Sequence, residues 1–326
     1  MEFLSDYGLF LAKTLTVVVA MLLVVGGSLA LAHRPQIGRE GRLEVKDLSR
    51  RYREMGRLVE EALQPARGWR QRLAARRRAR REAQPAGERR VFVLDFRGDI
   101  QASAVASLRE EVSAILAVAT PRDEVVLRLE SPGGMVHGYG LAASQLQRFR
   151  EHGIPLTVAV DKVAASGGYL MACVANRILA APFAILGSIG VVAQLPNFHR
   201  WLRNHDIDFE LHTAGPYKRT LTLFGENTEE GRRKFQEELE DVHALFKYFI
   251  AEHRPALDLA RVATGEYWLG QRALELGLVD ELRTSDDYLL AASREARLML
   301  VRYRVRRSLG ERLMLAGVEL FSRWHA

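Results

Sequence analysis

Short apolar segments alternate with helix-like segments through the middle of the chain, and this alternation limits the possible folds more than any other feature. Two segments between the apolar runs, 103–119 and 139–152, have apolar residues at helical spacing, and a third, 164–176, opens with glycines. The apolar runs themselves cover 91–95, 124–130, 155–161 and 178–182. Because repeated strand–helix–strand units build parallel sheets covered on both faces, we predict an α/β domain over residues 90–305.

An uncharged segment near the N-terminus predicts a membrane anchor. Residues 15–32 carry no charge, and with residues 9–12 the apolar stretch reaches 24 residues, broken only by Lys13. A helix of that length crosses about 30 Å of hydrocarbon, so we predict a single transmembrane anchor over residues 9–32. The alternative is a cleaved secretory signal, because residues 30–32 match an A-x-A cleavage site. Glu2 and Asp6 stand where such a signal has basic residues, which favours the uncleaved anchor.

A basic segment separates this anchor from the α/β domain. Residues 33–90 hold 18 basic and 8 acidic residues, so they carry more than the whole net charge of +7. The rest of the chain is therefore slightly acidic, which argues against a nucleic-acid-binding protein. We predict a charged helix over residues 40–82 inside a basic linker, 33–89, which either contacts anionic lipid headgroups or acts as a spacer. By the positive-inside rule, the basic residues after the anchor place the domain in the cytoplasm.

Composition excludes several classes of protein. With 48% hydrophobic and 27% charged residues the chain builds a core, so it is neither disordered nor a multi-span membrane protein. Its single cysteine, Cys173, excludes an internal disulfide framework and lies in an apolar segment, where we expect it to be buried. Neither a phosphate-binding loop nor a cluster of metal ligands is evident, so we expect no cofactor and no metal. Residues 306–326 predict a C-terminal amphipathic helix.

Two glycine-rich turns follow predicted strands and are candidates for a ligand site. Residues 131–134 read Ser-Pro-Gly-Gly, and residues 165–169 read Ala-Ser-Gly-Gly-Tyr. Ligands bind beyond the carboxyl ends of parallel strands, and glycines let backbone N–H groups approach them closely. Ser166 is therefore a candidate nucleophile, with the Gly167 amide and a second amide from the 131–134 turn as an oxyanion hole. The alternatives are a serine N-cap and an ordinary turn.

A serine nucleophile needs a base, and the sequence favours a lysine. The G-x-S-x-G motif is absent, and His137 stands close after the first turn without the context of a triad. A lysine can accept the proton if desolvation lowers its pKa from about 10.4 toward about 7–8. Lys218 lies in a turn after a predicted strand, 207–214. The other lysines of the domain are expected to stay protonated, on a charged helix over 227–254 or beside Asp161: Lys162, Lys234 and Lys247.

Taken in order, several motifs resemble the signal peptide peptidase A family of membrane-anchored serine peptidases, in particular its SohB branch. The resemblance covers nearly the whole chain and rests on the two glycine-rich turns, Gly-Ser-Ile-Gly-Val at 187–191, and the segments 196–198, 213–223 and 264–282. It implies a ClpP/crotonase-like fold of repeated ββα units. It also implies a Ser/Lys dyad in which Ser166 is the nucleophile and Lys218 the general base. Three further roles follow from it: the amides of Gly134 and Gly167 are the oxyanion donors, and Ser188 orients the lysine.

The resemblance also implies partners and a location. Members form rings in which neighbouring subunits complete each active site, so a homo-oligomer and a peptide or protein substrate are expected. A location outside the cytoplasm is implied, in contrast to the charge distribution. The chain departs from the family at Arg219, where a serine often follows the lysine. Two alternatives stay open: a crotonase-type enzyme acting on acyl-CoA with the same oxyanion hole, and a non-catalytic membrane scaffold.

Overall fold

The computed structural model describes residues 8, 10, 11, 13–19, 21, 41–63 and 89–305. Its backbone divides into two units, one of residues 43–303 and one of residues 1–42 with 304–326. Most of the predicted anchor, residues 9–32, and all of the predicted C-terminal helix, 306–326, lie outside the described residues. Within the described part of the chain, no helix is both long and apolar enough to span a bilayer.

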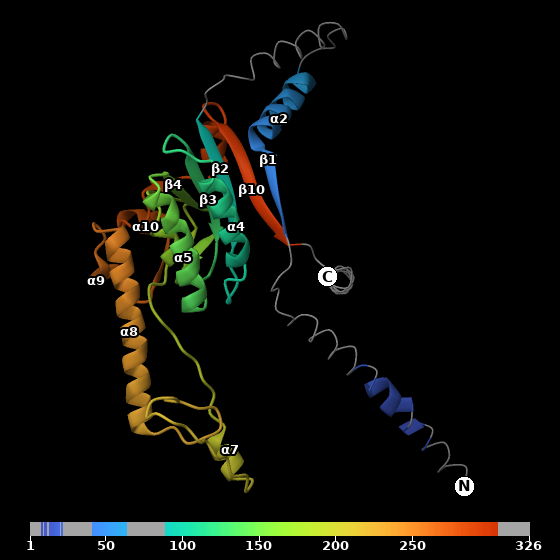
Figure 1. Ribbon diagram of the computed structural model, residues 1–326, viewed down its shortest axis with the longest axis vertical. Helices are drawn as coiled ribbons and strands as arrows, with labels where there is room; N and C mark the ends of the chain where they lie inside the picture. The colour runs from blue at the N-terminus through green and yellow to red at the C-terminus, as the bar shows by residue number, and fades with distance from the viewer. Residues whose placement is uncertain are drawn as a thin grey trace. The chain divides into compact units, whose positions relative to one another are not determined.

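A seven-stranded sheet forms the centre of the larger unit (Figure 1). Each pairing along its succession β10, β2, β3, β4, β6 and β9 is parallel. This parallel order confirms the α/β class predicted from the alternating segments. The strands, in spatial order, are β1 (Gly41–Asp47), β10 (Arg297–Val305), β2 (Arg90–Arg97), β3 (Glu124–Glu130), β4 (Leu156–Val160), β6 (Arg177–Ala180) and β9 (Glu281–Leu282).

Two apolar clusters cover the faces of this sheet. The larger includes Phe92 and Leu94 of β2 and residues of the helices α4 (Val105–Leu116), α5 (Val136–Glu151) and α6 (Gly167–Ala172). The smaller takes the alternate residues Val91 and Val93, with residues of α2 (Leu48–Leu63) and α11 (Ser285–Ala292). Since successive side chains of a strand point to opposite faces, burial of both faces explains why the strand sequences are continuously apolar.

A second, three-stranded sheet carries the short strands that follow β4 and β6. It consists of β5 (Val163–Ala165), β7 (Ile185–Gly187) and β8 (Tyr267–Leu269), with β5 and β7 parallel and β8 antiparallel to β7. The succession β4–β5–α6 is therefore a ββα unit, and β6–β7 repeats its two strands. Such units are what the family resemblance implied. The helix α10 (Gly270–Glu275) follows β8.

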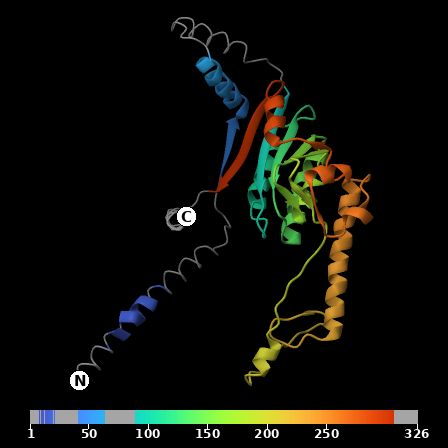
Figure 2. The same ribbon diagram turned by 180° about the vertical axis from the view of Figure 1, so that it is seen from behind.

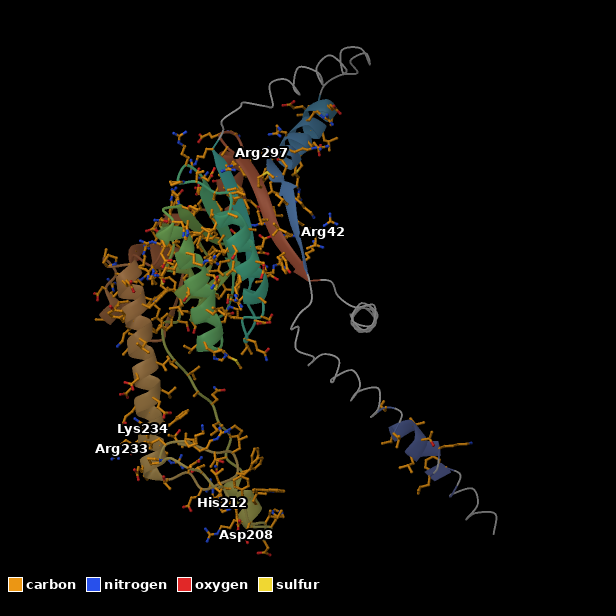
Figure 3. All side chains as sticks on the ribbon, viewed as in Figure 1. Arg42, Asp208, His212, Arg233, Lys234 and Arg297 are labelled. Carbon is orange, nitrogen blue, oxygen red and sulfur yellow. The ribbon has the colours of Figure 1, made fainter. Side chains whose placement is uncertain are left out.

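Residues 192–228 form a small lobe at one end of the helix α8 (Glu229–His253), as both ribbon views show (Figures 1 and 2). The lobe contains the short helix α7 (His199–Arg203) and an aromatic cluster in which Phe224 lies 6.1 Å from Phe198 and 5.7 Å from Phe209, between ring centres. The Lys234 amine lies 5.5 Å from the centre of the Tyr217 ring. Figure 3 labels Lys234 on α8. The helix α9 (Leu259–Val262) follows α8.

Two predicted elements differ from the structure. The predicted charged helix over 40–82 is confirmed at Leu48–Leu63, but residues 41–47 form the edge strand β1, so the linker is not helical throughout, and residues 64–82 lie outside the described residues. A hydrogen bond connects α2 to β10, since the Ser49 hydroxyl accepts from the amide of Leu298 at 2.8 Å. The predicted strand over 207–214 is absent, although its apolar residues alternate. It has no neighbouring strand in the lobe, and a strand without a partner leaves its backbone groups unpaired.

A buried carboxyl group on α4 makes stability depend on pH. The Glu111 side chain is 5% exposed, and its Oε1 accepts a hydrogen bond from the Tyr303 amide at 2.7 Å. Burial raises the pKa of Glu111 to about 7, from 4.5, although the Tyr303 amide and Arg302 favour the charged form. Since the folded state then holds a proton that the unfolded state has lost, stability falls as the pH rises from about 4.5 to about 7.

Glu111→Gln is expected to remove this dependence, because glutamine keeps an acceptor oxygen without a charge. The free energy of unfolding of the variant, relative to the original protein, should therefore rise by about 3 kcal/mol between pH 4.5 and pH 8. Urea titrations at both pH values measure this difference, with exposed Glu110→Gln as the control. An equal difference between Glu111→Gln and the original protein at both pH values would contradict the prediction.

Candidate functional site

Ser166 lies on a sharp turn between a strand and a helix. It follows β5 and immediately precedes α6, with φ 51° and ψ −120°. A positive φ is unusual for a residue with a side chain and costs about 1–3 kcal/mol, so the surrounding structure holds the serine there. Its amide donates to the carbonyl oxygen of Gly187 at 2.8 Å, and its carbonyl oxygen accepts from the Leu170 amide at 3.0 Å. This is the geometry of a nucleophile elbow, formed without the G-x-S-x-G motif.

The Ser166 hydroxyl does not cap the helix that it precedes. No side-chain hydrogen bond forms at this N-cap position, which argues against the alternative that Ser166 serves as a helix cap. By contrast, Thr228 at the start of α8 accepts a hydrogen bond from the Gly231 amide at 3.1 Å. The Ser166 side chain is partly exposed, so the hydroxyl is accessible for chemistry.

The two glycine-rich turns lie against each other. Ser131 bonds to β5 on both sides, since its amide donates to the Val163 carbonyl oxygen at 2.8 Å and its own carbonyl oxygen accepts from the Ala165 amide at 3.0 Å. Two residues further on, Gly133 has φ +91°, and a Cβ there would lie 2.7 Å from the Ser166 Cβ and 2.9 Å from the Gly167 nitrogen. Only glycine fits this contact. The turn at residues 131–134, which the sequence indicated as a candidate, therefore lies next to Ser166.

Two amides near Ser166 are available as donors. Gly167 is the first residue of α6, where an amide has no acceptor within the helix. The Gly134 amide, in the facing turn, donates to no other described residue. Two such N–H groups beside a hydroxyl can stabilise a negatively charged oxygen.

Ser188 lies beside Ser166 because the strands that precede them are paired in register. Ala165 is opposite Gly187 in the parallel pair of β5 and β7, so the two serines follow at the same edge of the small sheet. Ser188 also has a positive φ, 50°, and its amide donates to the Glu266 carbonyl oxygen at 2.7 Å. The structure thus brings together four of the five predicted site residues: Gly134, Ser166, Gly167 and Ser188.

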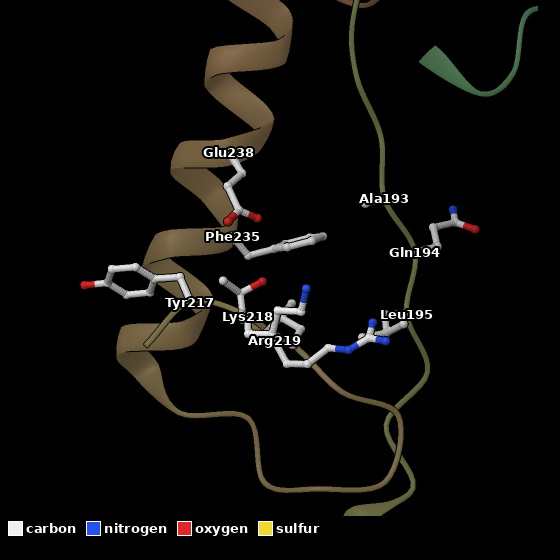
Figure 4. A pocket seen from close by; sticks show the side chains of 10 residues that line it. Ala193, Gln194, Leu195, Tyr217, Lys218, Arg219, Phe235 and Glu238 are labelled. Carbon is white, nitrogen blue, oxygen red and sulfur yellow. The ribbon is translucent and has the colours of Figure 1, made fainter. Parts of the chain in front are cut away.

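The fifth predicted residue, Lys218, lies in the small lobe. It lines a cavity of about 450 Å³ between the segment 193–195 and the first turns of α8, where the Lys218 side chain lies next to Phe235 and Glu238 (Figure 4). The residue is exposed in the single chain. None of the residues around Ser166 lines this cavity.

Lys218 lies near the N-terminal end of α8, whereas the C-terminal end of this helix packs against the core. The buried residue of α8 is Ile250, and Phe246 and Phe249 also pack against the core. A helix rises about 1.5 Å per residue, so Phe235 beside Lys218 lies about 22 Å from Ile250. Lys218 therefore lies far along α8 from the core, and the residues that line its cavity do not include the turns at Ser166.

The remaining candidate residues have structural positions. Burial raises the pKa of Cys173, whose thiol donates to the Leu170 carbonyl oxygen at 3.2 Å, so this cysteine is a core residue as expected. The Lys162 amine lies 3.0 Å from a carboxylate oxygen of Glu130 rather than pairing with Asp161. His137 is exposed in the first turn of α5. Sequence reasoning missed Tyr139, because no local pattern marks a tyrosine that packs against a glycine-rich turn.

A strained serine between a parallel-sheet strand and a helix, with free amides beside it, is an arrangement typical of hydrolases. The family model for the N-terminal part of peptidase family S49 matches residues 2–146, and the model for peptidase family S49 matches residues 148–299. A protein of Haemophilus influenzae named "Probable protease SohB" is 51% identical over 323 residues, which cover 94% of this chain and 91% of that protein.

Two further comparisons extend this result. "Probable protease SohB" of Buchnera aphidicola subsp. Acyrthosiphon pisum is 60% identical over 225 residues, 69% of this chain and 67% of that protein. Among solved structures, a mutant of the 1510-N membrane-bound stomatin-specific protease matches 63% of this chain and 84% of its own, with 14% identity and a TM-score of 0.43. The chain belongs to peptidase family S49, the signal peptide peptidase A family, in its SohB branch.

Proposed function

We propose that this peptidase is a membrane-anchored serine endopeptidase whose dyad joins Ser166 of one copy to Lys218 of another. The observation that carries the proposal is the strained, uncapped Ser166 between the two glycine-rich turns. The ClpP/crotonase-like description of the fold belongs to the same proposal and is supported by the ββα succession β4–β5–α6.

In the proposed reaction, the Ser166 hydroxyl oxygen attacks the peptide carbonyl carbon while the Lys218 amine accepts the hydroxyl proton. The amides of Gly134 and Gly167 stabilise the oxyanion, and Ser188 orients the lysine. The C–N bond then breaks as the leaving amine takes the proton from Lys218. The Lys218 amine then deprotonates a water molecule, which hydrolyses the acyl ester. The proton passes from Lys218 to the Ser166 oxygen and regenerates the hydroxyl.

A second copy explains how the lysine reaches the serine. The lobe that holds Lys218 exposes many large apolar side chains, which a monomer in water does not normally group together. Contact with a neighbouring copy would bury them and remove water from the amine, as a general base requires. They are Val192, Leu195, Phe198, Trp201, Ile207, Phe209, Leu211, Tyr217, Leu223 and Phe224.

Membrane attachment is part of the proposal. The segment 9–32 would be the anchor, the basic linker 33–89 would contact lipid headgroups, and residues 306–326 would form the C-terminal helix. Substrates would be membrane-derived or unfolded peptides, cleaved at the inner membrane. The charge distribution favours the cytoplasmic side for the domain, whereas the family resemblance favours the periplasmic side. Proteolysis of spheroplasts and of inverted vesicles distinguishes the two.

Covalent labelling tests the proposed nucleophile. A fluorophosphonate probe is expected to modify the purified protein at Ser166, because an activated hydroxyl attacks phosphorus as it attacks a carbonyl carbon. Mass spectrometry of the peptide that contains residues 163–176 locates the label, and Ser166→Ala should lose it whereas Ser144→Ala, at an exposed serine of α5, should keep it. A protein that stays unlabelled and instead binds coenzyme A tightly would favour the crotonase-type alternative.

A further inference from the structure

Tyr139 contacts both turns that present the candidate oxyanion donors. It lies in the first turns of α5 with a fully buried side chain. Its ring lies directly against Gly167, where any Cβ would overlap the ring atoms. Its hydroxyl reaches the other turn and lies 2.6 Å from the Ser131 Oγ. The Tyr139 side chain therefore packs against Gly167 and is hydrogen-bonded to Ser131, in the turn that contains Gly134.

The hydrogen bonds around this tyrosine form a chain with a defined direction. The Tyr139 hydroxyl donates to the Asp99 carbonyl oxygen at 2.8 Å. Since a phenol has one proton, the Ser131 hydroxyl must donate to Tyr139 across their 2.6 Å contact. The Ser131 Oγ then accepts from the Gly133 amide at 3.1 Å. Burial raises the pKa of Tyr139, so the phenol keeps the proton that this chain requires.

This chain fixes the peptide that precedes Gly134. The Gly133 amide is held by Ser131, and a Cβ on Gly133 would overlap Ser166 and Gly167, so this position has no room for a side chain. The orientation of Gly133 sets the direction of the next N–H, which belongs to Gly134. A shift of about 1 Å at such a donor costs catalysis even when substrate binding is preserved.

We infer that Tyr139 and Ser131 are positioning residues that align the Gly134 and Gly167 amides with the oxyanion formed at Ser166. The inference rests on the proposed function, because it concerns the same site. Neither side chain touches the substrate; both act through the backbone of the two turns.

Tyr139→Phe tests this role because phenylalanine keeps the ring against Gly167 and removes only the hydroxyl. We expect kcat for peptide hydrolysis to fall about tenfold to hundredfold, while KM changes by less than about twofold. A peptide aldehyde inhibitor, which places an oxyanion in the same position as the reaction, should bind more weakly by the factor lost in kcat/KM. Ser131→Ala should give a similar loss, and the double variant little more, since both break one chain.

Tyr288→Phe is the matched control. Tyr288 lies on α11 and is half-buried, and its hydroxyl donates to a carboxylate oxygen of Glu124 at 2.6 Å, outside the two turns. The control removes one hydrogen-bonded tyrosine hydroxyl and should change kcat by less than about twofold. A Tyr139→Phe enzyme with the kcat of Tyr288→Phe would overturn the inference. Full activity of Ser166→Ala would instead overturn the proposed function, so the two failures are distinguishable.

Discussion

Lys218→Ala is expected to lower kcat for peptide hydrolysis about a thousandfold or more, with little change in the folding of the chain. Removal of a general base costs about 10²–10⁴ in rate, and loss of one member of a dyad also leaves the nucleophile unactivated. The exposed position of Lys218 in the lobe means that the substitution breaks no core packing. Steady-state kinetics with an unfolded, apolar-rich peptide, together with a melting curve, measure both effects.

Lys247→Ala provides the control for that experiment. Lys247 is partly exposed, and it lies on α8 outside the cavity that Lys218 lines. Its replacement removes the same charge from the protein and should leave kcat within about twofold of the original value. If Lys218→Ala and Lys247→Ala have the same activity, Lys218 is not the base.

Gly133→Ala is expected to lower kcat at least about a hundredfold and to destabilise the protein by about 1–3 kcal/mol. The backbone has φ +91° at this position, which disfavours any residue with a Cβ. The new Cβ would also lie 2.7 Å from both the Ala165 carbonyl oxygen and the Ser166 Cβ, and 2.9 Å from the Gly167 nitrogen. Relief of these contacts must move the serine or one of the proposed oxyanion donors.

Gly153→Ala separates backbone strain from displacement of the site. Gly153 also has a positive φ, +67°, but a Cβ there would meet nothing within 4 Å. This variant should lose a similar amount of stability in urea titrations and keep its kcat. Equal kcat values for Gly133→Ala and Gly153→Ala would show that the contact with Ser166 has no catalytic importance.

The sequence predicted four of the seven strands of the large sheet, β2, β3, β4 and β6, because each is marked by an apolar run, but it did not predict β1, β9 and β10. The run over 124–130 coincides with β3, and the helix expected over 227–254 is α8 within two residues. The three-residue strands β5 and β7 are too short for an alternation pattern to reveal. They nevertheless determine the site, because their register places Ser166 beside Ser188.

The elbow at Ser166 could not be predicted from local preferences, since serine rarely adopts a positive φ. It arises from tertiary contacts, with Ser131 bonded to β5 and Gly133 packed against the turn. The same limit explains the strand wrongly predicted at 207–214: its alternation of apolar residues was correct, but strand formation depends on a neighbour that the lobe does not supply. The position of Lys218 likewise depends on the fold of the lobe, and no local pattern encodes the contact between copies that we propose for it.

Mixing two inactive variants tests most directly whether one copy supplies the serine and another the lysine. Ser166→Ala and Lys218→Ala would be purified separately, then dissociated and reassociated at equal concentrations. In randomly mixed rings, about a quarter of the sites would join an intact Ser166 to an intact Lys218, so we predict recovery of about a quarter of the original activity. Activity no higher than that of the separate variants would contradict a dyad formed between copies.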